Sequence, residues 1–479
     1  MGVLSGLEPK RVFEIFEELC AIPHGSTHTK AISDWCAAFG KRLGLECHQD
    51  EAGNVILIAP ATAGYENAPA VILQGHLDMV CEAEPGCPKD MDAEGLELFV
   101  DGDVVGAKGT TLGGDDGIAV AMALAALEDE SLPHPRLEAV LTTDEEIGML
   151  GAAVLDVSPL QGRTMLNIDS EAEGVFTVGC AGGSRVSCRL PLVRAAFAGE
   201  TLSIRVSGLV GGHSGVEIDK GRANADVLLG RLVKAASDAA ELRLISAAGG
   251  SKDNAIPTEA EAVVSVSDAE AAQAAVNAAA AQLKKECRAA DPGLTVTVTP
   301  AAAQWLPMDA DTTKKAICLL LCLPNGVQAM SMDIPGLVQT SLNLGILACE
   351  EGQLSADFSV RSSVASQKQM VQERLQCLME QIGGHTAIWG DYPAWEYLPE
   401  SPLRQRMTEV YREQYGTEPV IETIHAGVEC GIFSEKLPGL DCVSFGPDLT
   451  DIHTPRERMH IASVQRTWAL LWEVLKRSR

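Results

Sequence analysis

Long apolar runs and targeting signals are absent from this sequence. No stretch approaches the roughly 18 uncharged apolar residues that a membrane-spanning helix needs. The N-terminal residues MGVLSGLEPKRVFEIFEELC carry acidic side chains in an amphipathic pattern. They lack the basic and then apolar segments of a secretory signal peptide. We therefore expect a soluble, cytoplasmic protein that contacts no membrane.

Basic residues are scarce relative to acidic ones. The chain has 37 Lys and Arg against 66 Asp and Glu, which gives a formal net charge of −29. This charge disfavours nucleic acid and anionic membranes as partners, because both are polyanions. It does not by itself indicate a cationic substrate, since a cytoplasmic enzyme can simply be acidic.

Cysteine motifs are also missing, although the chain has 14 cysteines and none is in a Cys-x-x-Cys pair. Several stand in apolar segments, such as Cys318 and Cys322 in AICLLLCL and Cys377 in RLQCLME. In a chain of this length the pattern favours buried, reduced thiols over a disulfide framework.

Three common catalytic or binding motifs fail on inspection. No P-loop and no dinucleotide fingerprint occurs. The segment GGHSGV is not the G-x-S-x-G motif of serine hydrolases, because its glycine falls one place early. The sequence thus gives no support to a nucleotide-binding enzyme or a serine hydrolase.

The 479 residues are too many for one ordinary hydrophobic core. Up to residue 185 helix and strand patterns alternate, which predicts an α/β domain with a mixed, largely parallel sheet flanked by helices. Residues 186–399 combine helices with strands of period two, which predicts an α+β domain with an antiparallel sheet. The α/β pattern returns over 400–479. We therefore expect one α/β domain, interrupted by an inserted domain.

The segment VILQGHLDMV, residues 71–80, predicts a buried strand that ends with His76 and Asp78. A histidine at a strand end is usually a hydrogen-bonded core or surface residue, and an aspartate there is ordinary turn chemistry. The alternative is a metal-bound imidazole whose other N–H is held by the Asp78 carboxylate. The second interpretation requires further ligands elsewhere in the chain.

Further candidate ligands follow other predicted strands or open a helix. They are Asp115 in TTLGGDDGIAVAM, Glu145 and Glu146 after LEAVLTTD, Asp169 after MLNI, and His453 in SFGPDLTDIHTP. Ligands gather at the carboxyl ends of strands in open α/β sheets, so these groups can converge. Two imidazoles with several carboxylates suit zinc or a comparable first-row metal. Five ligands, one of them bridging, indicate two metals about 3.5–4 Å apart.

Two of these positions have a more specific interpretation. Asp115 is the candidate bridge, because the glycines around it permit a close backbone approach. Glu145 and Glu146 are adjacent, so their side chains diverge. One can therefore bind a metal while the other takes a proton from a metal-activated water.

Nine motifs resemble a known enzyme group, in order along essentially the whole chain. They are GHLDMV, GTTLGGDDGIA, TTDEEIGM, NIDSEAEG, GCAGG, GGHSG, NAIP, HAGVECG and DIHTPRE. The group is the di-zinc exopeptidases of clan MH, which includes peptidase T, peptidase V, glutamate carboxypeptidase and aminoacylase. The branch that the chain resembles most is that of the cytosolic non-specific dipeptidases, also called aminoacyl-histidine dipeptidases or peptidase D.

The resemblance implies a role for each candidate ligand. His76, Asp115 and Asp169 would hold one metal, and Asp115, Glu146 and His453 would hold the other. Glu145 would be the general base, with Asp78 behind the His76 ring. The α/β domain would then be the catalytic metallopeptidase domain, formed by residues 1–185 and 400–479.

The same resemblance implies that the inserted domain, residues 186–399, is a lid. It places His213 over the site as a donor to the developing oxyanion. It suggests Arg361 as a clamp on the substrate carboxylate, for which a planar guanidinium is suited. Asn254 would be a further substrate contact. His425 and Glu429 of HAGVECG are candidates for binding the free amine, with a structural role as the alternative.

Two positions depart from the usual pattern of the group. Asp116 follows the bridging Asp115 where an asparagine is usual, and Arg456 stands in HTPRE where an acidic residue is usual. Neither change removes a ligand, but both bear on metal choice and substrate preference. The resemblance also predicts that the peptide bond between Asp115 and Asp116 is cis.

The function implied is metal-dependent hydrolysis of unblocked dipeptides, Xaa-His among them. Two divalent ions would act, most simply zinc, with cobalt or manganese as alternatives. An N-acyl amino acid hydrolase or a carboxypeptidase on the same scaffold is the enzymatic alternative. A catalytically silent binding protein is the non-enzymatic one, against which the intact ligand set argues. Closure of the lid within one chain, or across a homodimer, is left open.

Overall fold

The structure is a computed structural model that describes residues 2–479, and it divides into two units. The first unit contains the chain up to Cys180 together with Tyr397–Thr423 and Val428–Arg479, and the second contains Ala181–Glu396 and Ile424–Gly427. The sequence pattern placed the changes of domain at 185 and 399. It did not predict that residues 424–427 return to the second unit.

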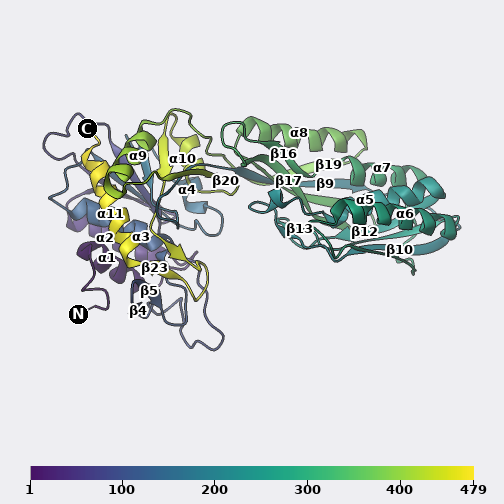
Figure 1. Ribbon diagram of the computed structural model, residues 1–479, viewed down its shortest axis with the longest axis horizontal. Helices are drawn as coiled ribbons and strands as arrows, with labels where there is room; N and C mark the ends of the chain where they lie inside the picture. The colour runs from purple at the N-terminus through teal and green to yellow at the C-terminus, as the bar shows by residue number, and fades with distance from the viewer. Residues whose placement is uncertain (1) are drawn as a thin grey trace. The chain divides into compact units, whose positions relative to one another are not determined.

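The first unit is built on a mixed sheet of eight strands, in the order β1-β2-β6-β3-β7-β21-β8-β20 (Figure 1). The strands are β1 (Glu46–Gln49), β2 (Val55–Ala59), β3 (Val71–His76), β6 (Leu137–Thr142), β7 (Thr164–Asn167), β8 (Val175–Cys180), β20 (Val420–Ile424) and β21 (Asp441–Ser444). Parallel pairing joins β6, β3, β7 and β21. Outside this centre, the pairs β1–β2, β2–β6 and β21–β8 are antiparallel. Parallel strands end at the same edge, so the predicted ligands that follow them start from one side of the sheet.

A small-residue helix packs on the centre of this sheet. Its sequence GIAVAMALAALE is buried almost throughout, and it contacts β3 and β6. The close approach depends on Gly75, since a Cβ there would lie 2.7 Å from the Cβ of Ala119. The helices of this unit are α1 (Lys10–Cys20), α2 (Lys30–Arg42), α3 (Gly114–Glu128), α4 (Leu150–Val154), α9 (Pro402–Tyr415), α10 (Cys430–Lys436) and α11 (Ile461–Lys476).

A smaller four-stranded sheet completes the first unit. Its strand order is β22-β23-β5-β4. The strands are β4 (Leu98–Asp101), β5 (Val104–Ala107), β22 (Leu449–Thr450) and β23 (Arg458–His460). This sheet brings the segment before α11 next to a hairpin from the first quarter of the chain.

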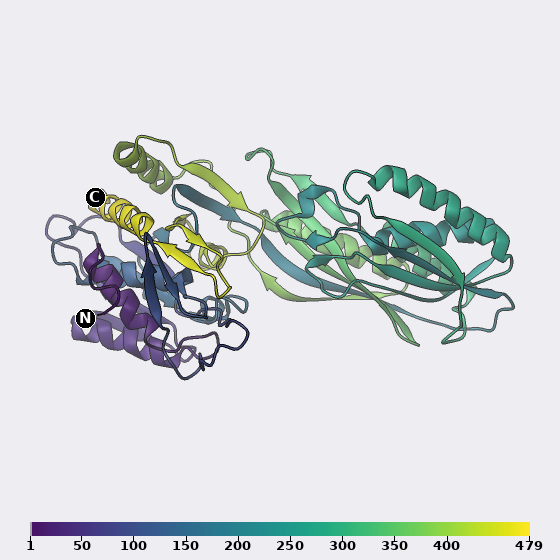
Figure 2. The ribbon, with the colours of Figure 1, turned by 60° about the horizontal axis from the view of Figure 1, so that its bottom comes forward.

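The second unit is a nine-stranded sheet in which neighbouring strands are antiparallel, with helices packed on it (Figure 2). Alternate residues of the strand Gln353–Ser362 are buried, which is the expected pattern for a sheet with one covered face. The strands are β9 (Gly182–Pro191), β10 (Glu200–Ser207), β12 (Leu242–Gly249), β14 (Ala260–Val266), β15 (Thr295–Pro300), β16 (Gly326–Met330), β17 (Val338–Cys349), β18 (Gln353–Ser362) and β19 (His385–Tyr392). A separate ribbon pairs β11 (Gly212–His213) with β13 (Ala255–Ile256).

The helices of the second unit pack on different parts of its sheet. α5 contacts β10, β12 and β14, whereas α8 contacts β9, β18 and β19. The elements are η1 (Ile218–Lys220), α5 (Ala225–Ala239), α6 (Ala269–Cys287), α7 (Ala310–Cys322) and α8 (Ala365–Gln381). Figure 1 shows α5, α6, α7 and α8 lying along the sheet. The α/β and α+β patterns of the sequence thus describe the two units correctly.

The prediction of buried thiols is wrong for several cysteines. Of the cysteines in the two apolar segments, Cys318 is half-buried, whereas Cys322 and Cys377 are exposed. The inward residues of α7 include Ala316, Leu319 and Leu320, so Cys322 lies on the opposite face. Apolar residues on either side of a cysteine in the sequence therefore do not determine whether its side chain lies on the buried face of the helix.

Among residues 2–479, no helix has both the length and the apolar character needed to cross a bilayer.

Substitution of Gly75 by alanine should lower the free energy of unfolding by about 1–3 kcal/mol, because an added methyl group overpacks the contact between β3 and α3. The new Cβ would also lie 2.6 Å from Oδ2 of Asp116. Urea unfolding of the metal-free protein measures the effect. Gly6→Ala is the matched control, since no atom lies within 4 Å of its added Cβ. Equal unfolding midpoints for the two variants would contradict the prediction.

Candidate active site

His76 is the last residue of β3, and its side chain is 1% exposed. Its Nδ1 lies 2.9 Å from the backbone oxygen of Asp78 and 3.6 Å from the Oδ1 of that residue. The predicted partner residue is therefore correct, but the nearer atom is its carbonyl and not its carboxylate. A ring that donates from Nδ1 leaves the Nε2 lone pair free to bind a metal.

The Asp78 carboxylate has a different task. Its Oδ1 accepts the backbone N–H of Glu145 at 3.0 Å, and its Oδ2 accepts the N–H of Glu146 at 3.3 Å. The Ser26 hydroxyl donates to the same carboxylate at 2.8 Å. Asp78 thus ties the end of β3 to the turn after β6 that carries both glutamates.

Asp115 lies between the two histidines. Its Oδ1 is 3.2 Å from Nε2 of His76, and its Oδ2 is 3.1 Å from Nε2 of His453. Asp169 approaches the first histidine, with 3.7 Å between its Oδ1 and the His76 Nε2. Glu146 approaches the second, with 2.9 Å between its Oε1 and the His453 Nε2. One carboxylate oxygen therefore faces each imidazole, as a bridging ligand requires.

In each of three groups of residues, the potential ligand atoms lie within 4.8 Å of one another. The groups are His76 with Asp116 and Asp169, His76 with Glu145 and Glu146, and Asp115 with Glu146 and His453. The structure therefore brings the six predicted residues, five ligands and one base, to one place.

Asp116 contributes a carboxylate oxygen to one of these groups and also contacts strand β3. It is buried, and its Oδ2 accepts the backbone N–H of His76 at 3.1 Å. Burial raises the pKa of its carboxyl well above the ordinary value. The peptide bond between Asp115 and Asp116 is cis, as predicted.

The sequence pattern suggested that His453 follows β21 directly, but the structure places it further along the chain. It lies on the loop between β22 and β23, with a positive φ of 59°. Arg456, on the same loop, is exposed, and its Nε is 3.9 Å from Oδ2 of Asp451. That arginine therefore points to a loop aspartate and not to the ligand set.

The charges of the cluster shift its pKa values strongly. Burial, together with the charges of nearby carboxylates, raises the pKa of Glu145 to about 8 and that of Asp169 well above its ordinary value. Burial opposes ionisation of Asp115, but hydrogen bonds with His453 and His76 outweigh it and lower its pKa. Carboxylates this crowded repel one another, and divalent cations relieve that repulsion. The donor set therefore fits two such ions.

A second group of predicted residues lies in the other unit. Arg361, on β18, donates from Nη1 to the Tyr392 hydroxyl at 3.1 Å. His425 lies with its Nε2 2.7 Å from the Ser341 hydroxyl. Within residues 2–479, Nε of Arg361 and Nδ1 of His425 are buried and have no hydrogen-bond partner. The Arg361 N–H is therefore an unused buried donor, and the His425 ring nitrogen is a second unpartnered polar atom in the same unit, so both are available to a polar ligand.

Arg361 also lowers the pKa values of two histidines near it. Burial, and then the guanidinium charge, lower the pKa of His425 to about 4. The same two causes, in the same order, lower the pKa of His213. Both imidazoles are therefore neutral at pH 7, and the cluster carries the arginine charge.

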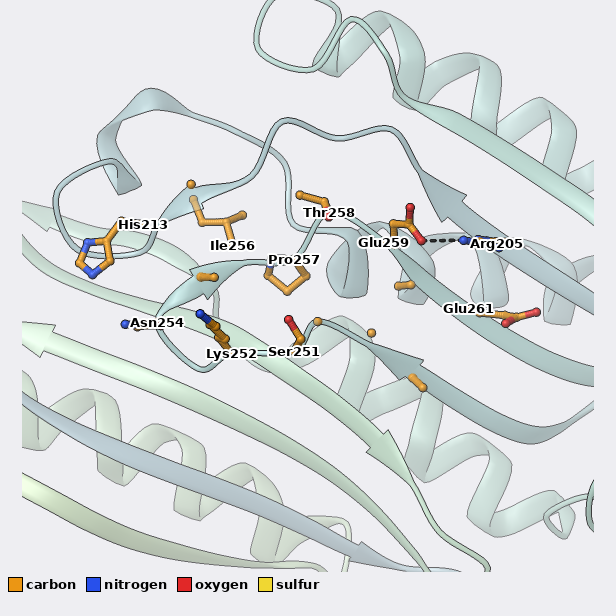
Figure 3. Close-up of a pocket in the computed structure, with 16 residues that line it drawn as sticks. Arg205, His213, Ser251, Lys252, Asn254, Ile256, Pro257, Thr258, Glu259 and Glu261 are labelled. Carbon is orange, nitrogen blue, oxygen red and sulfur yellow. Dashed lines mark hydrogen bonds and ion pairs between the residues drawn. The ribbon is translucent and has the colours of Figure 1, made fainter. Parts of the chain in front are cut away.

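His213 and Asn254 line one cavity of about 900 Å³ in the second unit (Figure 3). His213 belongs to β11, and the Ser214 N–H donates to the backbone oxygen of Asn254 at 2.9 Å. Arg205 and Glu259 form an ion pair elsewhere in the same cavity. The ribbon of β11 and β13 therefore presents the two predicted residues together.

Glu429 is placed differently from its predicted partner His425. It belongs to the first unit, is fully buried, and accepts hydrogen bonds from Gln74 at 2.6 Å and Thr142 at 2.7 Å. It offers no accessible surface to a substrate amine in this structure. The sequence contained one sign of this buried polar network. Otherwise apolar strands are interrupted by the polar residues Gln74, Thr142 and Asn167.

Comparison with known proteins gives the family. Residues 72–477 match peptidase family M20/M25/M40. The chain is 38% identical over 480 residues to the cytosol non-specific dipeptidase of Escherichia coli (strain K12), and the match covers 99% of both proteins. This chain belongs to peptidase family M20/M25/M40. As a member of the M20 family it is a metallopeptidase, a hydrolase of peptide bonds.

Solved structures of M20-like enzymes confirm the fold. The aminoacylhistidine dipeptidase of Vibrio alginolyticus matches with a TM-score of 0.94 and 35% identity, covering 99% of this chain and 98% of that one. A tripeptidase of Staphylococcus aureus matches with a TM-score of 0.56 and 16% identity over 100% and 99% of the two chains, and this shows the fold alone. The predicted fold class and the predicted resemblance are both confirmed.

His425 should stay neutral far below the pH at which a free imidazole titrates. Histidine NMR spectra of the whole protein should show that the His425 ring titrates with a midpoint near pH 4, because burial and Arg361 both oppose its charge. Arg361→Met should raise that pKa by removing the repulsion. A His425 ring that titrates near pH 6.5 in the unmodified protein would contradict this account.

Proposed function

We propose that this M20 family member is a two-metal dipeptidase that hydrolyses unblocked dipeptides, Xaa-His among them. The observation that carries the proposal is the position of Asp115, which presents one carboxylate oxygen to His76 and the other to His453. The names of the E. coli and V. alginolyticus relatives support the same substrate class. The "cytosol" in the first name supports a cytoplasmic location.

The residues present suit two zinc ions, with cobalt or manganese as alternatives. His76, Asp115 and Asp169 would hold one ion, and Asp115, Glu146 and His453 would hold the other. When bound, such ions polarise the scissile carbonyl and make a water molecule acidic. The Nδ1 contact of His76 with the Asp78 carbonyl keeps its Nε2 directed at the ligand cluster.

Glu145 is the proposed general base. Its carboxylate would take the proton of the attacking water and deliver it to the leaving nitrogen. Burial and the neighbouring charges raise its pKa, which is the direction that helps a carboxyl hold a proton between these two steps. Asp78 fixes the backbone of Glu145 and of the neighbouring ligand Glu146, so the base is held next to the metal site without binding a metal itself.

The second unit would serve as a lid that reads the substrate. We assign Arg361 to the C-terminal carboxylate, with its guanidinium oriented by Tyr392. His425 belongs at the same end, in place of the amine-binding role suggested by the sequence. A neutral imidazole beside a guanidinium can donate to a carboxylate, whereas a substrate ammonium would be repelled there. His213 would donate to the oxyanion and Asn254 would contact the substrate, whether the lid closes on its own chain or on a homodimer partner.

Metal analysis and a substrate panel test this function. We expect two zinc ions per chain and rapid hydrolysis of unblocked dipeptides, including Xaa-His. N-acetyl amino acids and longer peptides should be poor substrates, in line with the dipeptidase names of the two relatives. Faster turnover of N-acetyl amino acids would instead identify an N-acyl amino acid hydrolase on this scaffold.

Glu145→Ala should lower kcat by about 10²–10⁴-fold, as the loss of a general base does. Its zinc content and thermal unfolding midpoint should stay close to those of the unmodified protein. His76→Ala is the contrasting variant and should lose metal, which atomic absorption measures. Near-normal turnover by the Glu145 variant would mean that another group is the base.

Arg361→Ala should raise KM by about 10–100-fold, which corresponds to the 1.5–3 kcal/mol of a hydrogen bond to a charged group. The variant should also discriminate less against dipeptides with an amidated C-terminus. His213→Ala should instead lower kcat by about 10²–10³-fold, with metal content unchanged. Steady-state kinetics measure both effects.

Arg231→Ala is the matched control for Arg361, because Arg231 forms an exposed ion pair with Glu286 on the helical side of the same unit. Its KM and kcat should not change. An unchanged kcat in His213→Ala would remove the lid histidine from the proposed machinery.

A further inference from the structure

Glu457 is a buried carboxylate that none of the roles above uses. It is 2% exposed, and it receives four backbone N–H groups. Its Oε2 accepts those of Leu112 at 2.7 Å and Gly113 at 3.1 Å. Its Oε1 accepts those of Gly114 at 2.8 Å and Asp115 at 3.4 Å. One side chain therefore holds the backbone of the segment that ends in the bridging ligand.

The four N–H groups stand at the start of α3, where backbone donors have no partner within the helix. The N-cap residue is Gly113, which has no side chain to accept hydrogen bonds from these groups. A buried carboxylate is costly unless it is hydrogen-bonded, and charge-assisted bonds of this kind are strong. Each partner thus satisfies the other, which makes the geometry of this contact well defined.

The same loop that supplies Glu457 also supplies His453. That histidine is 44% exposed and has a positive φ, as does Asp451 two residues earlier. Residues other than glycine adopt this conformation at a cost of about 1–2 kcal/mol each. The Glu457 N–H donates to the Thr454 oxygen at 3.0 Å, which closes a turn between the histidine and the glutamate. The loop is therefore strained at one end and anchored at the other.

We propose that Glu457 is a positioning residue that sets the spacing of Asp115 and His453. Its carboxylate joins the loop of one residue to the loop of the other, and their side chains meet at 3.1 Å. The affinity of the metal that these two residues would share then depends on Glu457. This inference rests on the ligand set of the proposed function, but Glu457 touches neither metal nor substrate in it.

A carboxylate that merely stabilises the fold would behave differently, and the chain offers one for comparison. Glu138, at the start of β6, is fully buried and accepts the N–H groups of Gln161 and Gly162 at 2.9 Å each. Arg136 also donates to it. The other end of β6 leads to the glutamates of the cluster, so Glu138 is remote from the ligands within the same unit.

The test is zinc binding by the metal-free, full-length protein, with Glu457→Gln, Glu457→Asp and Glu138→Gln compared. Glutamine places an N–H₂ donor against backbone donors, and aspartate falls short by one methylene group. Either change at 457 should raise the Kd of the zinc ion assigned to Asp115, Glu146 and His453 by about 10–100-fold. The Kd of the other ion should rise less, because it shares only Asp115 with the affected loops. The visible spectrum of the cobalt-loaded Glu457 variants should change in the same way as that of His453→Ala.

Glu138→Gln should keep both zinc affinities, even where its thermal unfolding midpoint falls as far as that of Glu457→Gln. Unchanged Kd values in both Glu457 variants would overturn the inference, and so would equal weakening in Glu138→Gln. If the glutamine variant at 457 does not fold, the aspartate variant decides the same question. An unmodified protein that binds no zinc or cobalt would contradict the proposed function itself.

Discussion

Crowding of like charges is the constraint on which the first unit depends. Asp115, Glu145, Glu146 and Asp169 bring four carboxyl groups to two imidazoles in one place. Such a cluster opposes folding unless protons or cations neutralise it. Burial and then the neighbouring carboxylates raise the pKa values of Glu145 and Asp169, and these shifts express the cost of placing the charges there. The parallel centre of the sheet, the α3 helix and the loop before β23 hold the groups together in spite of it.

Carboxylates that are not proposed ligands hold the segments that carry the ligands. Asp78 fixes the backbone of Glu145 and Glu146, Asp116 fixes that of His76, and Glu457 fixes that of Asp115. Each contact joins an acceptor on one segment to a backbone N–H on another. Because the N–H groups cannot move without their residues, the ligand geometry is built into the backbone before any ion binds.

The sequence predicted elements and residue types well, because both have local causes. Short apolar runs located β3, β6 and β7, and the glycine-rich turn before GIAVAM located the start of α3. Local sequence patterns could not predict contacts between segments that are distant in the chain. The nearer approach of His76 to the Asp78 carbonyl, the loop that carries His453, and the four bonds to Glu457 all depend on tertiary geometry. The exposed faces of Cys322 and Cys377 depend on how α7 and α8 pack, which spacing alone did not settle.

The order in which the segments are synthesised bears on when the ligand cluster can form. The second unit is almost continuous in sequence, whereas the first is assembled from segments on both sides of it. β21, which pairs with β7 in the parallel centre, and His453 both follow the insertion. A growing chain can therefore complete almost all of the second unit while the first still lacks a central strand and the proposed metal ligand His453. The ligand set becomes whole only when the last tenth of the polypeptide has been made, so a truncated product cannot carry the complete site.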